Sequence, residues 1–241
     1  MNCFTILVLR VIYVFCIHAH HSNTISERLD YTAEEAKRLL TFNKNYAEFG
    51  CGPYLITHPG DPSHYCYVHT LEEVLVALRD ASPSFIIKIE LKGTNTAIPS
   101  VELVNKLNMS HRCHYSSFIH SRIAEVRSIN VDAITGALFD HRLPADFVQQ
   151  ALAVGAMEVH LKYDTCTWDV IQMAHEAGLR VMAWFRGPIG MKEDCDTKYF
   201  DVGNEDNDMY QIVLRSGVDS MCVNRPDVMV KTLAEVLSVA T

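Results

Sequence analysis

The sequence predicts an α/β fold in which parallel strands alternate with helices, and we interpret it as a (β/α) TIM-type barrel. From Phe85 onward, short apolar runs alternate with helix-like segments, an order typical of parallel strands joined by crossover helices. An open doubly wound sheet would also fit, but no G-x-G-x-x-G turn follows any of the runs, which removes the main reason to prefer a dinucleotide-binding sheet. The 241 residues suit one small barrel, so we expect a single domain over residues 1–241.

Composition argues against some classes of function. Hydrophobic residues make up 49% of the chain, enough for a core, and the formal charge of −8 argues against a nucleic-acid-binding surface. The eight cysteines include no C-x-x-C pair, so a zinc site built from cysteines is not expected. A disulfide among the loop cysteines Cys51, Cys66 and Cys195 stays open.

The amino-terminal stretch from Cys3 to Ile17 is apolar but interrupted by Arg10, and it has two interpretations. It could be the core of a signal peptide, although no Lys or Arg precedes the apolar run. It could also contain a β-strand over Val11–Ile17, which is rich in β-branched and aromatic residues. We favour the strand, and the location of the protein stays open between cytoplasmic and secreted.

Two helices are expected before the first strand of the alternating part. The segments Thr32–Leu40 and Thr70–Leu78 each begin with a threonine followed three residues later by a glutamate, Glu35 and Glu73 respectively. This spacing is that of a capping box, in which the two side chains satisfy backbone N–H groups reciprocally. Residues 43–68, between the two helices, are rich in Gly, Pro, Tyr and His and predict a loop.

From Phe85 onward the pattern predicts strands and helices in turn. The expected strands are Phe85–Leu91, Cys113–Phe118, Ala133–Phe139, Met157–Leu161, Arg180–Phe185 and Asp219–Val223. The expected helices are Ser100–Leu107, His120–Ser128, Pro144–Val154, Thr167–Ala177 and Asn207–Ser216.

Capping signals support these helices. Thr165 or Thr167 can cap one helix and Asn207 or Asp208 another. Glycine follows three of the helices, where a left-handed residue is wanted, at Gly155, Gly178 and Gly217.

The strand at Phe85–Leu91 is unusual because charges interrupt it at every second position. Lys88, Glu90 and Lys92 alternate with apolar residues, so all three share one face. A parallel barrel strand has no solvent face, since helices cover its outside. A glutamate near its carboxyl end therefore points to the mouth of the barrel, where active sites lie. The alternative is a structural ion pair of Glu90 with Lys88 or Lys92.

The order of several segments resembles the glycerophosphodiester phosphodiesterase domain. The resemblance runs from about Ile17 to Asp227 and rests on the stretches YTAEEAKRLL, HTLEEVLVAL, IIKIELKG, YSSF, HEAGLRVMAWF and GVDSMCVNRPD. It implies a barrel of the PLC-like phosphodiesterase type. The family motifs HRG…ENT and E-x-D of the first two strands are not found, and VFCIHAHHSNTISER is similar to the third strand. The resemblance thus implies a barrel that is incomplete at its amino terminus.

The resemblance also implies roles for four residues, and position in the chain suggests a fifth. Glu90 corresponds to a metal-binding glutamate, and Lys92 to the lysine two residues later. His21 corresponds to a catalytic histidine, with His18 and His20 as competing matches. Trp184 corresponds to an aromatic pocket residue, although Phe185-Arg186-Gly187 stands where the family often has Thr-x-Asn, so phosphate contacts there are expected to differ. Ser117 ends the next strand and could contact substrate.

Each role has a structural alternative. The alternative for Lys92 is a salt bridge to Glu90, and for His21 a solvated histidine cluster. Trp184 could be a core residue, and the hydroxyl of Ser117 could be satisfied by backbone. The acidic segment from Met191 to Asp208 lacks the spacing of an EF-hand, and we interpret it as a solvated loop over the barrel mouth.

The implied activity is hydrolysis of glycerophosphodiesters to glycerol 3-phosphate and an alcohol, in glycerophospholipid metabolism. The resemblance implies a divalent cation, Ca²⁺ or Mg²⁺, and a small glycerophosphodiester or phospholipid head group as partner. Carboxylates suit such hard cations, and histidines suit acid and base roles. The alternative is a non-catalytic or truncated barrel of the same family that lacks the amino-terminal half of the active site.

Overall fold

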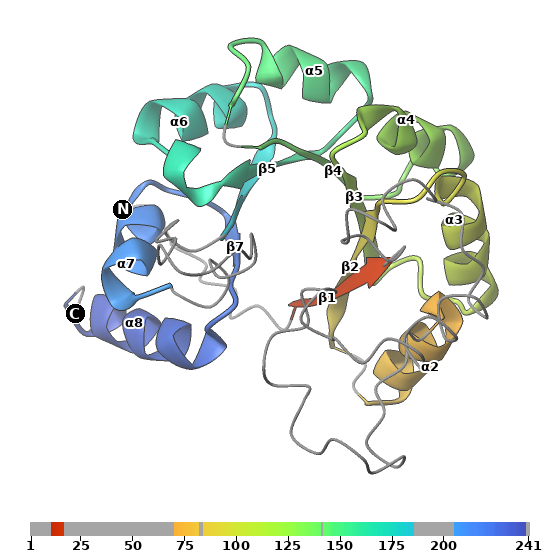
Figure 1. Cartoon of the computed structure of the whole chain (residues 1–241), viewed down its shortest axis with the longest axis horizontal. Coiled ribbons are helices and arrows are strands. Elements are labelled where there is room, and N and C mark those ends of the chain that lie inside the picture. The colour runs from red at the N-terminus through yellow and green to blue at the C-terminus, as the bar shows by residue number, and fades with distance from the viewer. Residues whose placement is uncertain (1–10, 17–69, 82–83, 141, 186–204, 240–241) are drawn as a thin grey trace, which may run out of the picture.

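Seven parallel strands form one sheet, which curves into an arc with the helices on its outer side (Figure 1). This computed structural model describes residues 11–16, 70–81, 84–140, 142–185 and 205–239. The strands are β1 (Val11–Cys16), β2 (Ile86–Leu91), β3 (Cys113–Ser117), β4 (Thr135–Leu138), β5 (Glu158–Lys162), β6 (Arg180–Trp184) and β7 (Ser220–Cys222). The strand expected at the amino terminus is therefore present as β1, parallel to β2.

The order of the strands in the sheet distinguishes a barrel from a doubly wound sheet. The strands neighbour one another in sequence order, from β1 to β7, and every pair is parallel. A doubly wound sheet reverses its strand order at a switch point, and this sheet does not. The described residues thus supply seven strands of a fold that has eight when complete.

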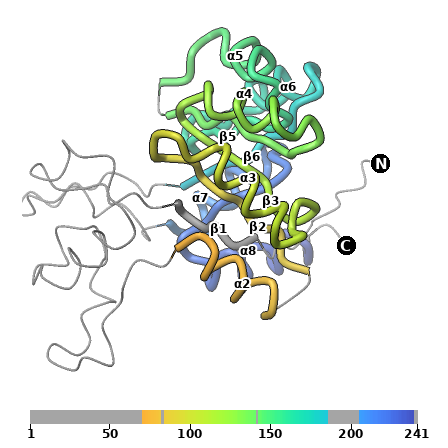
Figure 2. The backbone as a smooth tube through the Cα atoms, turned by 90° about the vertical axis from the view of Figure 1, so that its right-hand side faces the viewer, coloured from red at the N-terminus to blue at the C-terminus, as the bar shows by residue number. Residues whose placement is uncertain are grey.

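A helix covers the sheet after almost every strand. The helices are α2 (Leu71–Ala81), α3 (Ala97–Lys106), α4 (His120–Ile129), α5 (Phe147–Ala153), α6 (Trp168–Glu176), α7 (Asn207–Arg215) and α8 (Pro226–Val239), with a short 3₁₀ turn η4 (Tyr163–Thr165). Seen from the side, α4, α5 and α6 lie on one side of the strands and α2 and α8 on the other (Figure 2). Within the described ranges no helix combines the length and the apolar character needed to cross a membrane.

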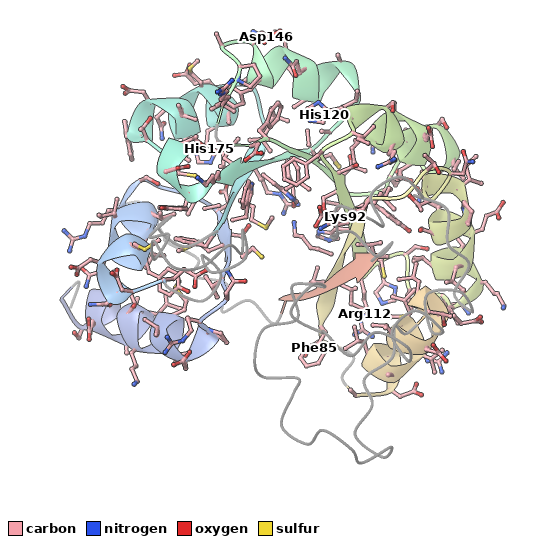
Figure 3. All side chains as sticks on the ribbon, in the orientation of Figure 1. Phe85, Lys92, Arg112, His120, Asp146 and His175 are labelled. Atoms are coloured by element: carbon pink, nitrogen blue, oxygen red, sulfur yellow. The ribbon has the colours of Figure 1, made fainter. Side chains whose placement is uncertain are left out.

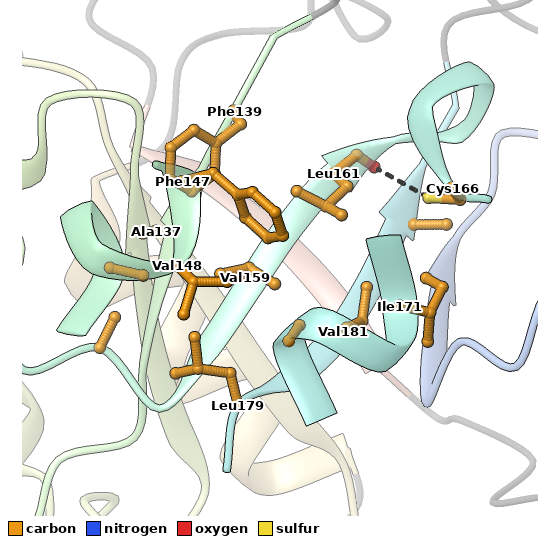
Figure 4. Packing of buried hydrophobic residues seen from close by; sticks show 14 of the residues in the cluster. Ala137, Phe139, Phe147, Val148, Val159, Leu161, Cys166, Ile171, Leu179 and Val181 are labelled. Carbon is orange, nitrogen blue, oxygen red and sulfur yellow. Dashed lines mark hydrogen bonds between the residues drawn. The ribbon is translucent and has the colours of Figure 1, made fainter. Parts of the chain in front are cut away.

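The apolar core lies between the outer face of the sheet and the helices. Ile87, Ile89 and Leu91 of β2 are fully buried and pack in one cluster with Leu75 of α2 and Val101 of α3. A second cluster joins the outer faces of β4, β5 and β6 to α5, α6 and α7 (Figure 4). Burying these side chains contributes about 25 cal/mol for each Å² of apolar surface removed from water. The alternating residues therefore face the interior of the barrel.

Capping interactions confirm part of the sequence analysis and correct another part. Thr70 and Glu73 form the expected box, with Thr70 N donating to Glu73 Oε2 at 2.7 Å and Glu73 N donating to Thr70 Oγ1 at 3.2 Å. Thr167 caps α6. The cap of α7 is Asp206, whose Oδ1 accepts from Met209 N at 2.9 Å, so the prediction of Asn207 or Asp208 was wrong by one or two residues.

Three further outcomes concern α8, the segment that begins at Thr32 and the glycines that follow helices. The sequence analysis did not predict α8, although Pro226 stands at its first position, where proline is favoured because it lacks an N–H that would be unpaired there anyway. The expected helix Thr32–Leu40 and the loop that follows it lie outside the described residues.

The three glycines at helix ends do have positive φ, for example 78° at Gly178.

The interior of the barrel contains a buried ionic cluster at the amino-terminal side of the strands. Its centre is Glu158 of β5, whose carboxylate pairs with Lys88 of β2, His160 of β5 and Arg180 of β6. The Arg180 Nη2–Glu158 Oε1 distance is 2.5 Å and the His160 Nε2–Glu158 Oε2 distance is 2.9 Å. Burial favours a raised pKa for Glu158, but the hydrogen bond from His160 and the charge of Lys88 outweigh it and hold that pKa far below its usual range.

His114 of β3 completes this cluster, with its Nδ1 3.9 Å from Glu158 Oε1. Burial is the largest cause that lowers the pKa of His114 and of His160, followed by the charge of Lys88, and both pKa values fall to about 4. Both histidines are therefore neutral near pH 7. The cluster then holds two cations around Glu158: Lys88, which is buried, and Arg180, whose side chain is 53% exposed.

Gly136 of β4 leaves the room that the ring of His160 occupies. A Cβ on Gly136 would lie 2.8 Å from His160 Cδ2 and closer still to Cε1 and Nε2. His160 has no exposed surface and its ring is held by Glu158. The ring therefore cannot move aside without breaking a buried hydrogen bond.

We expect Gly136→Ala to destabilise the protein by about 2–3 kcal/mol, because overpacking a fixed core typically costs 1–3 kcal/mol. Urea unfolding measures the change. Gly178→Ala is the control, since no heavy atom lies within 4 Å of its added Cβ and only the left-handed backbone opposes the change, at roughly 1 kcal/mol. A Gly136→Ala variant as stable as the wild type would contradict the tight contact.

We expect stability to fall as the pH decreases from about 6.5 to about 4. In this window the unfolded chain protonates His114 and His160, whose ordinary pKa is 6.5, while the folded chain with pKa values of about 4 does not. Unfolding therefore takes up protons, and each histidine can contribute up to about 1.4 kcal/mol per pH unit. Urea midpoints at pH 7.5 and 5 measure the slope.

Substitution of one histidine tests the origin of this acid sensitivity. His114→Gln should remove a substantial part of the slope, whereas substitution of His111, which is exposed and lies outside the cluster, should leave it unchanged. An equal slope in wild type and His114→Gln would show that His114 does not take part.

Candidate active site

The carboxyl ends of β2, β3, β5 and β6 bring several polar and aromatic side chains to one end of the barrel. Glu90 lies in β2 and Lys92 follows it, both on the face that points inward, opposite to Ile89 and Leu91. Figure 3 shows Lys92 on the concave side of the arc of strands, whereas Asp146 and His175 belong to the outer helices. The inward orientation expected for Glu90 and Lys92 therefore agrees with the structure.

Glu90 carries a buried carboxylate that is incompletely satisfied. Its side chain is 7% exposed, and Lys92 Nζ lies 3.4 Å from its Oε1. The contact is an ion pair without hydrogen-bond geometry, and Oε1 has no hydrogen-bond partner among the described residues. Burial raises the pKa of Glu90, and Lys92 opposes this shift in part. A carboxylate in such surroundings costs stability unless another positive group approaches it.

The Oε1 of Glu90, which accepts no hydrogen bond from the described residues, fits a divalent cation, since a carboxylate oxygen is the ligand that Ca²⁺ and Mg²⁺ prefer. Nowhere in the described part of the chain do three or more His, Cys, Asp or Glu side chains gather as a set of metal ligands. Glu90 would therefore supply one ligand, and Lys92 would stay beside it as a charge for a phosphate oxygen.

Trp184 lies at the carboxyl end of β6 and contacts Phe118, which follows β3. The two rings meet edge to face with centroids 5.9 Å apart, and Trp184 Nε1 donates to Phe139 O at 3.2 Å. Because β3 and β6 are not neighbours in the sheet, this pair crosses the mouth. Trp184 is only partly buried, as a pocket wall would be. Phe185, next to it, is buried in the outer core and stacks on Tyr163.

Ser117 lies on the outward face of β3 and has no exposed surface. Its hydroxyl donates to Leu91 O at 2.7 Å and accepts from Ile119 N at 3.0 Å. The backbone thus satisfies the hydroxyl, in agreement with the structural alternative for this residue. A contact of Ser117 with substrate stays a prediction that would require the loss of these bonds.

Sequence reasoning missed two charged groups near the same end of the barrel. Lys162 ends β5, and its Nζ pairs with Asp164 Oδ2 at 2.7 Å. Arg122 of α4 donates from Nη1 to Leu91 O at 3.2 Å and to Lys92 O at 2.8 Å. The alternation in EVHLK of β5 could have predicted that the side chain of Lys162 points into the barrel. No local sequence pattern indicates that Arg122, on a helix, reaches the end of β2.

A third group lies where β6 and β7 end. Asn224 Nδ2 donates to Phe185 O at 3.0 Å and to the carboxylate of Glu205, which is buried. These bonds link the segment before α7 to the ends of both strands. His21, and the competing His18 and His20, lie outside the described residues, so the catalytic role of His21 stays a prediction.

Comparison with known proteins agrees with this architecture. The sequence profile of the glycerophosphoryl diester phosphodiesterase family matches residues 21–228. A comparison with curated proteins found no match. A protein from Galdieria sulphuraria assigned as a glycerophosphodiester phosphodiesterase is 25% identical, with a TM-score of 0.58 over 70% of the chain and 65% of that protein.

Two further solved structures share the fold at lower identity. A glycerophosphodiester phosphodiesterase from Parabacteroides distasonis is 17% identical, with a TM-score of 0.52 over 74% of the chain and 68% of that protein. A phosphodiesterase from Oleispira antarctica, solved with the product sn-glycerol-3-phosphate, is 13% identical, with a TM-score of 0.57 over 71% of the chain and 64% of that protein.

The chain spans somewhat less than two thirds of the length of the Galdieria and Oleispira proteins. The family match nevertheless covers most of the chain, including Glu90, Lys92 and Trp184. The sheet order, the inward charges of β2 and this match lead to one conclusion: the chain belongs to the glycerophosphoryl diester phosphodiesterase family.

Proposed function

We propose that this barrel contributes to the hydrolysis of a glycerophosphodiester to sn-glycerol 3-phosphate and an alcohol, with the scissile phosphate bound at the carboxyl ends of the strands. The observation that carries the proposal is the buried Oε1 of Glu90, which forms an ion pair with the Lys92 ammonium but accepts no hydrogen bond from the described residues. The complex of the Oleispira phosphodiesterase with sn-glycerol-3-phosphate supports the substrate class.

The described residues would perform the binding part of this reaction. Glu90 would hold a divalent cation, which when bound neutralises charge on the phosphoryl oxygens. Lys92, 38% exposed at its side chain, would bind a phosphate oxygen as a point charge. Phe118 and Trp184 would exclude water from one side of the mouth, and His21 would supply a proton donor or acceptor.

A second candidate function is a non-catalytic member of the same family. It is favoured by one observation: the described residues offer a single candidate carboxylate ligand and no group of three metal-binding side chains. Such a protein would keep the fold and bind cations weakly. Cation binding and product release by the wild-type chain therefore discriminate between the two functions.

We expect Glu90→Gln to reduce cation-dependent release of sn-glycerol 3-phosphate from glycerophosphocholine by a factor of at least 100, an amount typical for loss of one electrostatic contact in a catalytic site. The same variant should unfold at an equal or higher urea concentration than the wild type, because burial of the Glu90 carboxylate is unfavourable and functional sites often cost stability. An enzyme-coupled assay with Ca²⁺ or Mg²⁺ measures the release.

The control for this experiment is Glu102→Gln, which changes an exposed glutamate on α3 and should alter neither quantity. Activity that survives in Glu90→Gln would overturn the role of Glu90. A wild-type chain that does not hydrolyse the substrate and binds either cation weakly or not at all by calorimetry would favour the non-catalytic function.

A further inference from the structure

The carboxyl end of β2 is held in place from outside the barrel. Leu91 O accepts two hydrogen bonds, from Ser117 Oγ of β3 and from Arg122 Nη1 of α4, and Lys92 O accepts a third, again from Arg122 Nη1. Two consecutive carbonyl groups are therefore bound by side chains. The pairing of β2 with β3 ends at Glu90 and Ser116, so these bonds continue where that ladder stops.

Arg122 makes these bonds from a buried position. The residue is 8% exposed, although it lies in the first turn of α4. Hydrogen bonds from a charged donor are stronger than neutral ones and gain further when water is excluded. Both bonds come from Nη1, whose two N–H groups lie in the plane of the rigid guanidinium, so the two carbonyls are held in fixed directions relative to each other.

The two carbonyls bound by Arg122 adjoin the residues of the candidate site. Glu90 precedes Leu91 directly, and Lys92 carries one of the carbonyls itself. A rotation of the backbone here would move the Glu90 carboxylate and the Lys92 ammonium together, and a misplacement of about 1 Å can reduce turnover by about 100-fold.

We propose that Arg122 is a positioning residue: by binding the carbonyl oxygens of Leu91 and Lys92 it fixes the orientation in which Glu90 and Lys92 face the mouth of the barrel. The proposal rests on the function proposed above for Glu90 and Lys92. Its structural part, the restraint on the end of β2, can be measured without any activity.

The chain provides a matched control on the same helix. Arg127 of α4 also donates from Nη1 to two backbone carbonyls, those of Val131 and Ala133, the latter at 3.1 Å. These carbonyls precede β4 at its amino end, whereas the site lies at the carboxyl ends of the strands. Arg127→Met therefore removes the same kind of contact without touching the end of β2.

Hydrogen exchange of the full chain tests the structural part. Arg122→Met should accelerate exchange of the backbone amides from Glu90 to Gly93 by at least tenfold, relative to wild type and to Arg127→Met. Exchange in β5 and β6 should be equal in both variants. No acceleration at Glu90–Gly93, or the same acceleration in both variants, would overturn the proposal.

Kinetics test the functional part. Arg122→Met should lower kcat for glycerophosphocholine by at least tenfold with little change in KM, Arg127→Met should leave both unchanged, and Arg122→Lys, which keeps a charged donor, should recover part of the loss. Equal losses in both methionine variants would show that Arg122 acts on stability alone.

A wild-type chain without activity would contradict the proposed function, and the exchange experiment would still decide whether Arg122 restrains β2. If Arg122→Met does not fold, Arg122→Lys takes its place in the exchange experiment. It should then show intermediate acceleration at Glu90–Gly93, and wild-type exchange rates there would again overturn the proposal.

Discussion

The contact between Lys88 and Glu158 inside the barrel constrains the arrangement of the whole sheet. Backbone hydrogen bonds join only neighbouring strands, and no such bonds join β7 to β1 among the described residues. Lys88 belongs to β2 and Glu158 to β5, so their ion pair crosses the interior, and Arg180 extends it to β6. Loss of one partner from a buried ion pair leaves an uncompensated charge and typically costs about 3–5 kcal/mol. The curvature that brings the strand ends together therefore depends on a polar cluster as well as on the apolar core.

The inward face of β2 adjoins two buried carboxylates, those of Glu158 and Glu90, which differ in how many of their hydrogen bonds and ion pairs are formed. Lys88 lies in the cluster around Glu158, where three donors meet one carboxylate. His160 and Lys88 outweigh the effect of burial and hold the pKa of Glu158 far below its usual range. Two residues after Lys88, Glu90 Oε1 has an ion pair with Lys92 but no hydrogen-bond partner among the described residues, and burial raises the pKa of Glu90. A fully paired buried carboxylate is typical of structure, whereas a poorly paired one at the carboxyl end of a barrel strand is typical of a site.

The sequence was sufficient for the described strands, for most of the described helices and for the inward orientation of Glu90, because period-two alternation and capping boxes act over a few residues. It did not predict α8. It failed where the determining partner is distant along the chain. Glu158 was not singled out, since its role depends on Lys88, 70 residues away, and Arg122 reaches the end of β2 from 30 residues away. The cap of α7 was misjudged because three neighbouring polar residues could all serve as caps, and only the backbone geometry selects Asp206. His21 lies outside the described residues, so its role rests on the family resemblance.

Apolar packing decides which chemistry β2 can present. Ile87, Ile89 and Leu91 are buried under α2 and α3, and a shift of one residue in the register of a strand exchanges its two faces. Such a shift would place Lys88, Glu90 and Lys92 in the apolar layer and three aliphatic side chains in the interior, which is unfavourable on both sides of the sheet. The burial of three aliphatic residues therefore determines which face of β2 points into the barrel. The pairing of Lys88 with Glu158 holds the middle of the strand, and the bonds of Ser117 and Arg122 hold its carboxyl end. Glu90 can remain incompletely satisfied because its neighbours, and not its own contacts, determine where it lies.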